Sequence, residues 1–223
     1  MTDQSMSLLD DISTRGAEIR AQLRELLHRH EYGCDTKTLV LVSYVDLALE
    51  HHEAIWLLRK SELTGSAFAL VRPVLDILFR ALWINAVATE EQVEQASRDE
   101  LYFPPMHEMR DDIKERYSDK SCPKQAELFD TLLRRLKDAW KTMSSYTHPG
   151  GHQITRRFTF DEVKPNYGED EIACALNLAT FALLLLIRMF WMSLSAQREA
   201  DEIAELLAKY SAEFNERLNN LSE

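Results

Sequence analysis

The stretch AFALVRPVLDILFRALWI, residues 67–84, is apolar except for three charged side chains, and it decides the fold class. Its apolar residues recur at helical spacing, so it predicts a helix in the middle of a core. Arg72, Asp76 and Arg80 stand about one turn apart on that helix and share one face. Charged groups belong in a core only where something pairs with them. Pro73 predicts a kink or a new helix start, because proline lacks a backbone donor and clashes with the preceding turn.

The rest of the chain repeats the same helical spacing. Only six glycines and six prolines interrupt 223 residues, and most long segments carry apolar side chains at i, i+3, i+4 and i+7. We therefore predict an all-α protein, a single-domain bundle over residues 1–223 with about six to eight helices. The expected helices cover residues 5–30, 39–59 with Asp35 or Thr36 as the cap, 67–87, a short segment opened by a capping box at 89–92, 107–117, 123–145, 169–195 and 198–219.

Residues 172–187 carry no charge, which raises the question of a membrane span. The run is shorter than the roughly 20 residues that a span needs, and it ends at Arg188. We interpret it as the central helix of the bundle. Three cysteines without a framework spacing, and an N-terminus without the features of a secretory signal, favour a reducing cytoplasm and no membrane partner.

The net charge of −11 excludes a general polyanion binder, since nonspecific affinity for nucleic acid depends on Lys and Arg. The balance reverses locally, because residues 134–164 contain seven basic and three acidic side chains. This basic excess coincides with a segment dense in histidine, arginine and glycine. A small anionic ligand or a short stretch of RNA is therefore a candidate partner there, and an ordinary solvated surface is the alternative.

That segment, YTHPGGHQITRR at residues 146–157, belongs to a connection that we expect to be irregular from 146 to 168. The Pro-Gly-Gly sequence at 149–151 predicts a turn, in which glycine permits a positive φ and leaves backbone N–H groups open to a ligand. The alternation over 154–160 also allows a short strand, although it has no evident partner strand.

Histidine and arginine flank the predicted turn. A histidine can act as a general base at neutral pH, and an arginine can stabilise a phosphoryl transition state. The catalytic candidates are His148, His152 and Arg156, which are the parts that a metal-independent ribonuclease would use. The alternative is an ordered loop whose histidines cap the preceding helix.

The charged stripe of the third helix has a surplus of one positive charge, because one carboxylate stands between two guanidinium groups. The spare guanidinium donors can hold a ligand carboxylate or phosphate. Asp46, Glu50 and Glu53 repeat at i, i+4 and i+7 on the second helix. A buried ion network between these two helices is therefore the alternative to a ligand site.

We predict no metal and no cofactor. The sequence ELLH at 25–28 is one Glu-x-x-His pair, whereas a di-iron site in a bundle needs a pair on each of two helices and two further glutamates. His51 and His52 are adjacent and point about 100° apart on a helix, so they do not readily share one ion. His52 falls on the face of Leu49 and Trp56, which favours a hydrogen-bonded core histidine.

The chain resembles a bacterial family of uncharacterised all-helical proteins. The likeness rests on GSAFALVRPVLD at 65–76, YTHPGGHQITRR at 146–157 and the entry into ALN at 175–177, and it extends over most of the chain. The architecture of that family is distantly similar to the HEPN helical bundles, many of which are ribonucleases or nucleotide-binding partners in toxin and defence systems. The Arg-x4-6-His signature of HEPN proteins has one match in spacing, Arg24 to His30, and it lies in the first helix. The resemblance therefore assigns no catalytic residue.

The predicted function is that of a cytoplasmic binding or regulatory module with a polar pocket. We expect the pocket to take a small anionic ligand, an RNA or a protein partner, and apolar helical faces favour a homodimer. The alternative is a metal-independent, HEPN-like ribonuclease or a toxin or defence component, and an antitoxin-like regulator is a third hypothesis. The residues expected to line the pocket are Arg72, Asp76, Arg80, Tyr146, His148, His152, Arg156 and Arg157.

Overall fold

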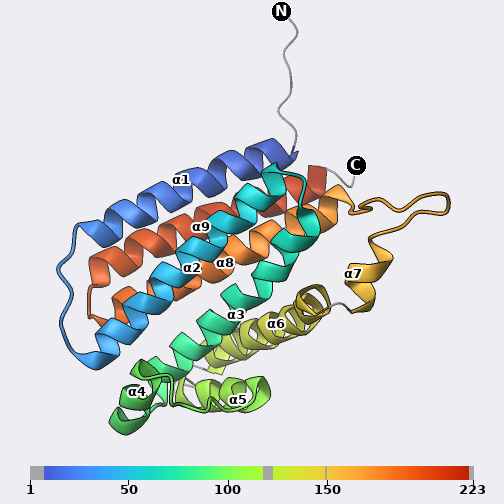
Figure 1. The fold of residues 1–223 in the computed structure, drawn as a ribbon. Helices are drawn as coiled ribbons and strands as arrows, with labels where there is room; N and C mark the ends of the chain where they lie inside the picture. The colour runs from blue at the N-terminus through green and yellow to red at the C-terminus, as the bar shows by residue number, and fades with distance from the viewer. Residues whose placement is uncertain (1–7, 118–122, 149, 221–223) are drawn as a thin grey trace, which may run out of the picture.

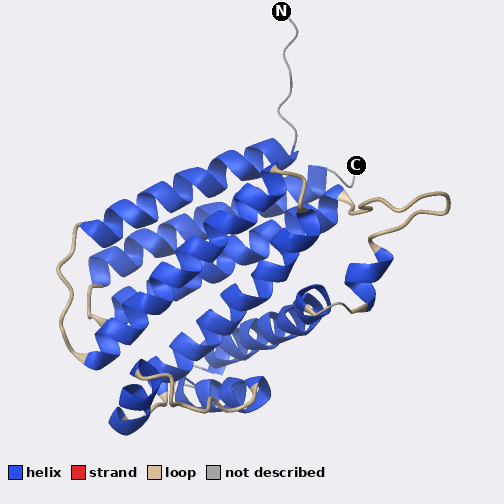
Figure 2. Cartoon of the chain, viewed as in Figure 1, coloured by secondary structure: helices blue, strands red, loops and turns tan. Residues whose placement is uncertain are grey.

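The computed structural model describes residues 8–117, 123–148 and 150–220, and these residues form nine helices and no strand (Figures 1 and 2). They make up a single helical domain, which confirms the predicted all-α class. The helices are α1 (Leu8–His28), α2 (Thr36–Lys60), α3 (Thr64–Ala86), α4 (Glu90–Ser97), α5 (Met106–Tyr117), α6 (Pro123–Thr147), α7 (Gly151–Thr155), α8 (Glu169–Ser193) and α9 (Gln197–Asn220).

Two helices begin at a capping signal that the sequence predicts. Asp35 caps α2 by accepting a hydrogen bond of 2.9 Å from the backbone N–H of Thr38. Thr89 and Gln92 form the predicted capping box at the start of α4. The number of helices in the described residues exceeds the predicted six to eight, because residues 151–155 form a short helix of their own, α7.

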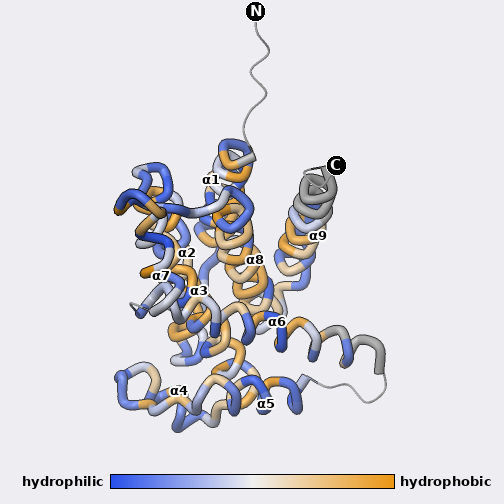
Figure 3. The backbone as a smooth tube through the Cα atoms, turned by 90° about the vertical axis from the view of Figure 1, so that its right-hand side faces the viewer, coloured by the Kyte–Doolittle hydropathy of each residue, from blue (hydrophilic) through white to orange (hydrophobic). Residues whose placement is uncertain are grey.

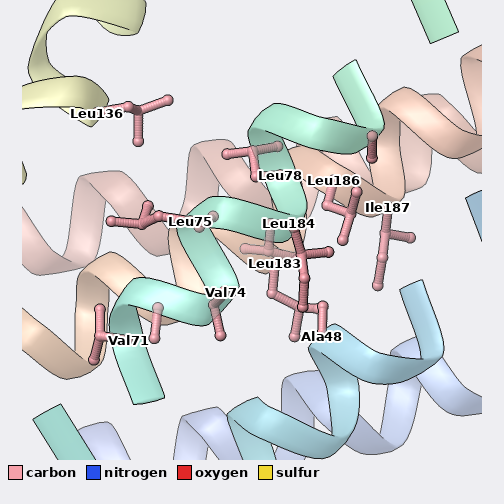
Figure 4. Close-up of a cluster of buried hydrophobic side chains, with 14 of the residues drawn as sticks. Ala48, Val71, Val74, Leu75, Leu78, Leu136, Leu183, Leu184, Leu186 and Ile187 are labelled. Atoms are coloured by element: carbon pink, nitrogen blue, oxygen red, sulfur yellow. The ribbon is translucent and has the colours of Figure 1, made fainter. Parts of the chain in front are cut away.

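α3 and α8 run side by side through the bundle, and α2 packs against both (Figure 1). Both helices are apolar nearly all round, as expected of helices that other helices surround. Figure 4 shows Val74 and Leu78 of α3, Leu183 and Leu184 of α8 and Ala48 of α2 in one cluster, each fully buried. Burying one such leucine or valine side chain stabilises the fold by about 1.5–3 kcal/mol, so this cluster contributes strongly to the stability of the bundle.

α8 is the central helix that its charge-free sequence predicts. Within the described residues it is the one helix long and apolar enough to cross a membrane, yet 72% of its most apolar window is buried inside the bundle. In Figure 3 its tube is mostly hydrophobic in colour and lies in the middle of the molecule. A core helix meets the same test of length and composition, so the apolar surface of α8 is accounted for by its neighbouring helices.

Pro73 lies in the middle of α3, which nevertheless runs unbroken from Thr64 to Ala86. Proline has no N–H to donate to the carbonyl of Ala69, four residues earlier. The hydroxyl of Thr147, the last residue of α6, lies 3.1 Å from that carbonyl and 3.2 Å from the carbonyl of Met143 in its own helix, so Ala69 and Met143 share this donor. Of the two predicted outcomes, a new helix start is therefore excluded, and the carbonyl that proline leaves free fixes α6 against α3.

The connection between α6 and α8 differs from the irregular loop expected over 146–168. Residues 146 and 147 are the last of α6, and residues 151–155 form α7. Residues 154–160 contain no strand, because the first two belong to α7 and the others are turn and coil. A helical turn satisfies its backbone within one segment, whereas a strand needs a partner that this part of the fold does not supply.

Candidate functional site

The charged stripe of α3 meets the end of α6. Arg72 Nη1 lies 2.6 Å from Nε2 of His148, the residue directly after α6. The same guanidinium lies over the ring of Trp140, with its central carbon 4.7 Å from the ring centroid. Asp76 accepts a hydrogen bond of 2.6 Å from Trp140 Nε1, and its other oxygen lies 3.6 Å from Arg72 Nε. We call these four residues the Arg72 cluster.

The Arg72 cluster lies at the edge of the bundle. The side chains of Arg72 and Asp76 are 19% and 33% exposed, and His148 is exposed. The expected position in the middle of the core is therefore wrong for this stripe. The helices around α3 cover its apolar faces, and its charged face lies at the boundary between the core and solvent.

Helical spacing on α6 explains why these groups meet. Trp140 and Thr147 lie seven residues apart, two turns along one face, and both contact α3. Thr147 is held at the carbonyl of Ala69, three residues before Arg72 in α3. The bond that compensates for proline therefore also places His148 beside Arg72.

Hydrogen bonding determines which groups the Arg72 cluster offers to a ligand. A guanidinium only donates, so His148 Nε2 accepts from Arg72 and the neutral ring carries its proton on Nδ1. The remaining N–H groups of Arg72 and the Nδ1–H of His148 are then all donors. Asp76 accepts from Trp140 through Oδ1, and its Oδ2 faces the buried Nε of Arg72. An outward set of donors suits the oxygens of a carboxylate or a phosphate.

Arg80 is not part of the Arg72 cluster. It is exposed, and its guanidinium carbon lies 4.6 Å from the ring centroid of Phe103. It also lies near Tyr44, whose pKa is raised by burial while Arg80 opposes that rise. Residues four apart on a helix drift by about 40°, so two turns rotate Arg80 by about 80° away from the direction of Arg72.

The acidic residues of α2 do not pair with the α3 stripe. Glu53 forms an ion pair of 2.5 Å with Arg24 of α1. Asp46 and Glu50 line a surface groove together with Arg24 and His28, both from α1. The acidic face of α2 is thus turned toward α1, and the predicted ion network between α2 and α3 is wrong.

A second polar cluster joins the end of α6 to the first turn of α8. Tyr146 is 4% exposed and its hydroxyl donates to Glu171 Oε1. Arg156 Nε lies 2.9 Å from Oε2 and 3.2 Å from Oε1 of the same carboxylate. Burial, and then Glu171, raises the pKa of Tyr146 to about 12, and the hydrogen bond to Glu171 raises the pKa of Arg156. In this Glu171 cluster, made of Tyr146, Arg156 and Glu171, the arginine is already neutralised.

Close packing at Gly65 fixes α7 on the first turn of α3. A Cβ at this position would stand 2.6 Å from Arg157 Nη2, 2.7 Å from the Tyr167 hydroxyl and 2.8 Å from Gln153 Oε1. Gln153 Nε2 donates to the carbonyls of Gly65 and Tyr146 at 3.2 and 3.3 Å, and the Tyr167 hydroxyl donates to Gln153 Oε1 at 2.9 Å. A Cβ at Gly65 would therefore displace the ends of these three side chains and disturb their hydrogen bonds.

The predicted glycine turn serves packing as well. Gly150 is the N-cap of α7 in an extended conformation with φ −87°, and no described glycine has a positive φ. A Cβ at Gly150 would stand 2.6 Å from Ser145 Oγ, which accepts a hydrogen bond from the backbone N–H of His152. Pro149 lies outside the described residues. The positive φ that the Gly-Gly pair allows is thus not used.

The two histidine rings of this segment take different partners. His148 contacts Arg72, whereas the ring of His152 is stacked on Tyr146, with centroids 5.6 Å apart and planes at 15°. Both residues are exposed. Neither contact is the predicted capping of α6 by the rings. The imidazoles lie at the surface, where a ligand can reach them.

The structure brings most of the predicted site residues into two adjoining clusters. Ligand binding and catalysis by these residues stay predictions. The sequence analysis missed Trp140, which shares a helical face with Thr147, and Glu171, which stands in the acidic first turn of α8. It also missed Gln153 and Tyr167, for which no spacing signal exists, because their partner Gly65 is far away in the sequence.

His52 confirms the prediction of a hydrogen-bonded core histidine. It is 0% exposed, and its Nε2 lies 2.8 Å from Thr180 Oγ1 and 3.3 Å from Trp56 Nε1. Arg20 Nη1 lies 3.4 Å from Nδ1 on the other side of the ring. Burial, and then Arg20, lowers the pKa of His52 to about 3. The ring is therefore neutral and belongs to the fold.

Residues 45–216 match the model of a family of unknown function, DUF6988. No curated protein and no solved structure matches the chain. The family match includes both polar clusters. In the described residues, no group of three or more His, Cys, Asp or Glu side chains is placed to hold a metal ion.

Proposed function

The chain belongs to the DUF6988 family of unknown function, and for this member we propose a binding function in which the Arg72 cluster holds an anionic group. The observation that supports the proposal most is the contact of 2.6 Å between Arg72 and His148 at an exposed edge of the bundle. Arg72 Nε is buried toward Asp76, so the donors left for a ligand are the terminal guanidinium N–H groups that His148 does not take and the Nδ1–H of His148. A carboxylate or phosphate has the complementary set of acceptors.

The surroundings of the pair support a preformed site. Trp140 lies against the guanidinium and donates to Asp76, so the arginine is held in place before a ligand arrives. Thr147 fixes the end of α6 on α3. A site whose donors are already positioned loses less conformational entropy on binding. The proposal therefore assigns recognition to Arg72 and His148, and positioning to Trp140 and Thr147.

A ribonuclease fits this geometry less well. A general base needs a free lone pair, and His148 Nε2 already accepts from Arg72. Arg156, the arginine nearest in sequence to both histidines, contacts both oxygens of Glu171 at 2.9 and 3.2 Å, whereas Arg72 lies 3.6 Å from its carboxylate partner, Asp76. Incubation of the protein with mixed RNA in EDTA separates the two functions. Cleavage that His148→Ala and His152→Ala abolish would establish the enzyme in place of the binding module.

The proposal is tested by thermal unfolding in inorganic phosphate, with chloride at the same ionic strength as reference. We expect phosphate at roughly ten times its Kd to raise the Tm of the wild type by about 3 °C. Arg72→Gln removes the charge and should abolish the increase that binding causes. Phosphate also stabilises proteins by exclusion from their surface, so the difference between variants is the result that counts.

Arg98→Gln is the matched control, because it removes the same charge from an exposed arginine on the flank of α4. This variant should keep the full phosphate response. Circular dichroism establishes that both variants are folded. An undiminished response in Arg72→Gln, or an equal loss in Arg98→Gln, would contradict the proposed function.

A further inference from the structure

The loop between α7 and α8 projects beyond the helices, on the right of Figure 1. We call residues 158–165 the arm. Its exposed apolar side chains are Phe158 (51%), Phe160 (103%) and Val163 (87%). Exposed apolar side chains gathered on one projecting segment are typical of an interaction surface.

The arm has a defined base and tip. The backbone N–H of Asn166 donates to the carbonyl of Arg156 at 2.9 Å, which closes the base. The N–H of Thr159 donates to the carbonyl of Glu162 at 2.8 Å, which closes a turn around the tip. These bonds close the loop around Phe160, whose side chain is fully exposed.

An apolar groove lies near the opposite end of α8. It has a volume of about 340 Å³ between α3, α6 and the last two turns of α8. Its lining is mostly leucine, methionine and phenylalanine, including Met192, which is 52% exposed. Arg188 is the one charged residue among the described residues that line it, and its Nε is buried without a hydrogen-bond partner in the described structure.

The arm carries what the groove lacks. Phe160 supplies an aromatic side chain of the size that an apolar groove can bury. Asp161 follows it directly and is exposed, whereas the neighbouring Glu162 already pairs with Lys164. A carboxylate next to the inserted ring would satisfy the guanidinium of Arg188, as buried charges require. The arm and the groove are therefore complementary in two respects: an aromatic ring fits an apolar groove, and a carboxylate can pair with Arg188.

The arm cannot reach the groove of its own chain. From Gly168 to Arg188 the helix rises about 30 Å, at 1.5 Å per residue. The arm is closed at Arg156 and Asn166, so its tip extends at most about 5 residues from the base, or roughly 17 Å. The groove that receives the arm must therefore belong to another molecule.

We propose that two copies of this chain form a two-fold dimer in which the Phe160 tip of each arm enters the groove of its partner and Asp161 pairs with the partner's Arg188. A closed two-fold dimer uses both arms and both grooves, so no arm and no groove stays exposed to solvent. Each copy then contributes the same two contacts. The proposal does not depend on the Arg72 cluster, and failure of the phosphate test leaves it unaffected.

The test is the solution mass of the full chain by light scattering after gel filtration, over roughly 10 to 200 µM protein. We expect twice the chain mass of 25.9 kDa for the wild type. Phe160→Ser should weaken dimerisation at least about tenfold in Kd. Tyr102→Ser is the matched control, since Tyr102 is a 97% exposed aromatic residue outside the arm. It should remain dimeric.

Charge reversal tests the ion pair separately. Asp161→Arg alone and Arg188→Asp alone should each weaken the dimer, because each places like charges together. The double variant restores the pair and should return to the wild-type mass. Asp161 and Phe160 are exposed, so their variants remain informative even where Arg188→Asp fails to fold. A monomeric wild type, a Phe160→Ser variant that dimerises normally, or a double variant that stays monomeric overturns the proposal.

Discussion

The molecule contains two histidine–arginine pairs in opposite surroundings. His52 is fully buried among α1, α2 and α8, with Nδ1 3.4 Å from Arg20 Nη1. His148 lies at the exposed end of α6, with Nε2 2.6 Å from Arg72 Nη1. Both rings contact a half-buried guanidinium, yet only the ring of His148 is open to solvent. The comparison shows that burial decides whether such a pair supports the fold or is open to a ligand.

The buried pair is fully engaged by the protein. Thr180 and Trp56 contact one nitrogen of His52 and Arg20 faces the other, so both ring nitrogens have protein partners. The open pair is engaged on one side only, where Trp140 and Asp76 hold the arginine. Substitutions should therefore affect stability at the first pair and binding at the second.

Truncating the buried ring should have the largest effect. His52→Ala leaves a cavity and removes the partners of Thr180 and Trp56, so we expect the free energy of unfolding to fall by about 3 kcal/mol. His148→Ala removes an exposed ring and should change it by less than about 0.5 kcal/mol. Urea unfolding of the two variants measures both values. Equal losses would remove the distinction between the pairs.

Stability should depend on pH through the buried ring. The pKa of His52 in the folded protein is about 3, below its ordinary value of 6.5, so only the unfolded chain takes up this proton between the two values. The contribution of the neutral His52 ring to the free energy of unfolding is complete above pH 6.5. It is lost as the pH falls toward 3, at about 1.4 kcal/mol per pH unit. Urea unfolding at pH 6.5 and pH 5 measures the slope.

His52→Gln lacks the titrating group and should lose that slope, whereas His148→Gln should keep it. These two variants change the same residue type in the two surroundings, so they isolate the effect of burial. A slope that is unchanged in His52→Gln would show that other groups cause the pH dependence.

The docking of α7 on α3 should be sensitive to added volume. Gly65→Ala forces a Cβ against Arg157, Tyr167 and Gln153, and we expect a loss of about 2 kcal/mol in the free energy of unfolding. Gly151→Ala is the control, because nothing lies within 4 Å of a Cβ at Gly151 and the residue is helical. Its stability should be unchanged or slightly increased. A neutral Gly65→Ala variant would contradict the docking of α7 on α3.

The smallest effect is expected at the carbonyl that Pro73 leaves without its usual donor. Thr147→Val keeps the shape of the side chain but removes the donor to Ala69, so stability should fall by about 1 kcal/mol. Thr142→Val is the control, since Thr142 bonds only the carbonyl of Asp138 within its own helix. Chemical unfolding compares the two, and equal losses would show that the contact with Ala69 contributes nothing.

Local signals in the sequence predicted much of the fold. Asp35 and the Thr89–Gln92 capping box mark helix starts, and the apolar run from 172 to 187 marks the central helix. His52 could be assigned to the core because it shares a helical face with Leu49 and Trp56, which are also buried. Each of these features depends on residues close in sequence, where helical geometry fixes the relation.

The site was predicted less well, because its contacts join distant segments. The stripe of Arg72, Asp76 and Arg80 looked buried, yet which side of α3 stays open depends on where α2 and α6 pack. The acids of α2 have the spacing for an ion network but face α1. Spacing within one helix fixes which residues share a face, and it does not fix which neighbour that face meets.

The most direct test of the account is an NMR titration of the histidine rings with inorganic phosphate at constant pH. We predict that the ring signals of His148 shift in a saturable way while those of His52 stay in place, and that Arg72→Gln abolishes the shift of His148. Signals of His148 that do not respond, or that respond equally in Arg72→Gln, would contradict an anion site at the Arg72 cluster.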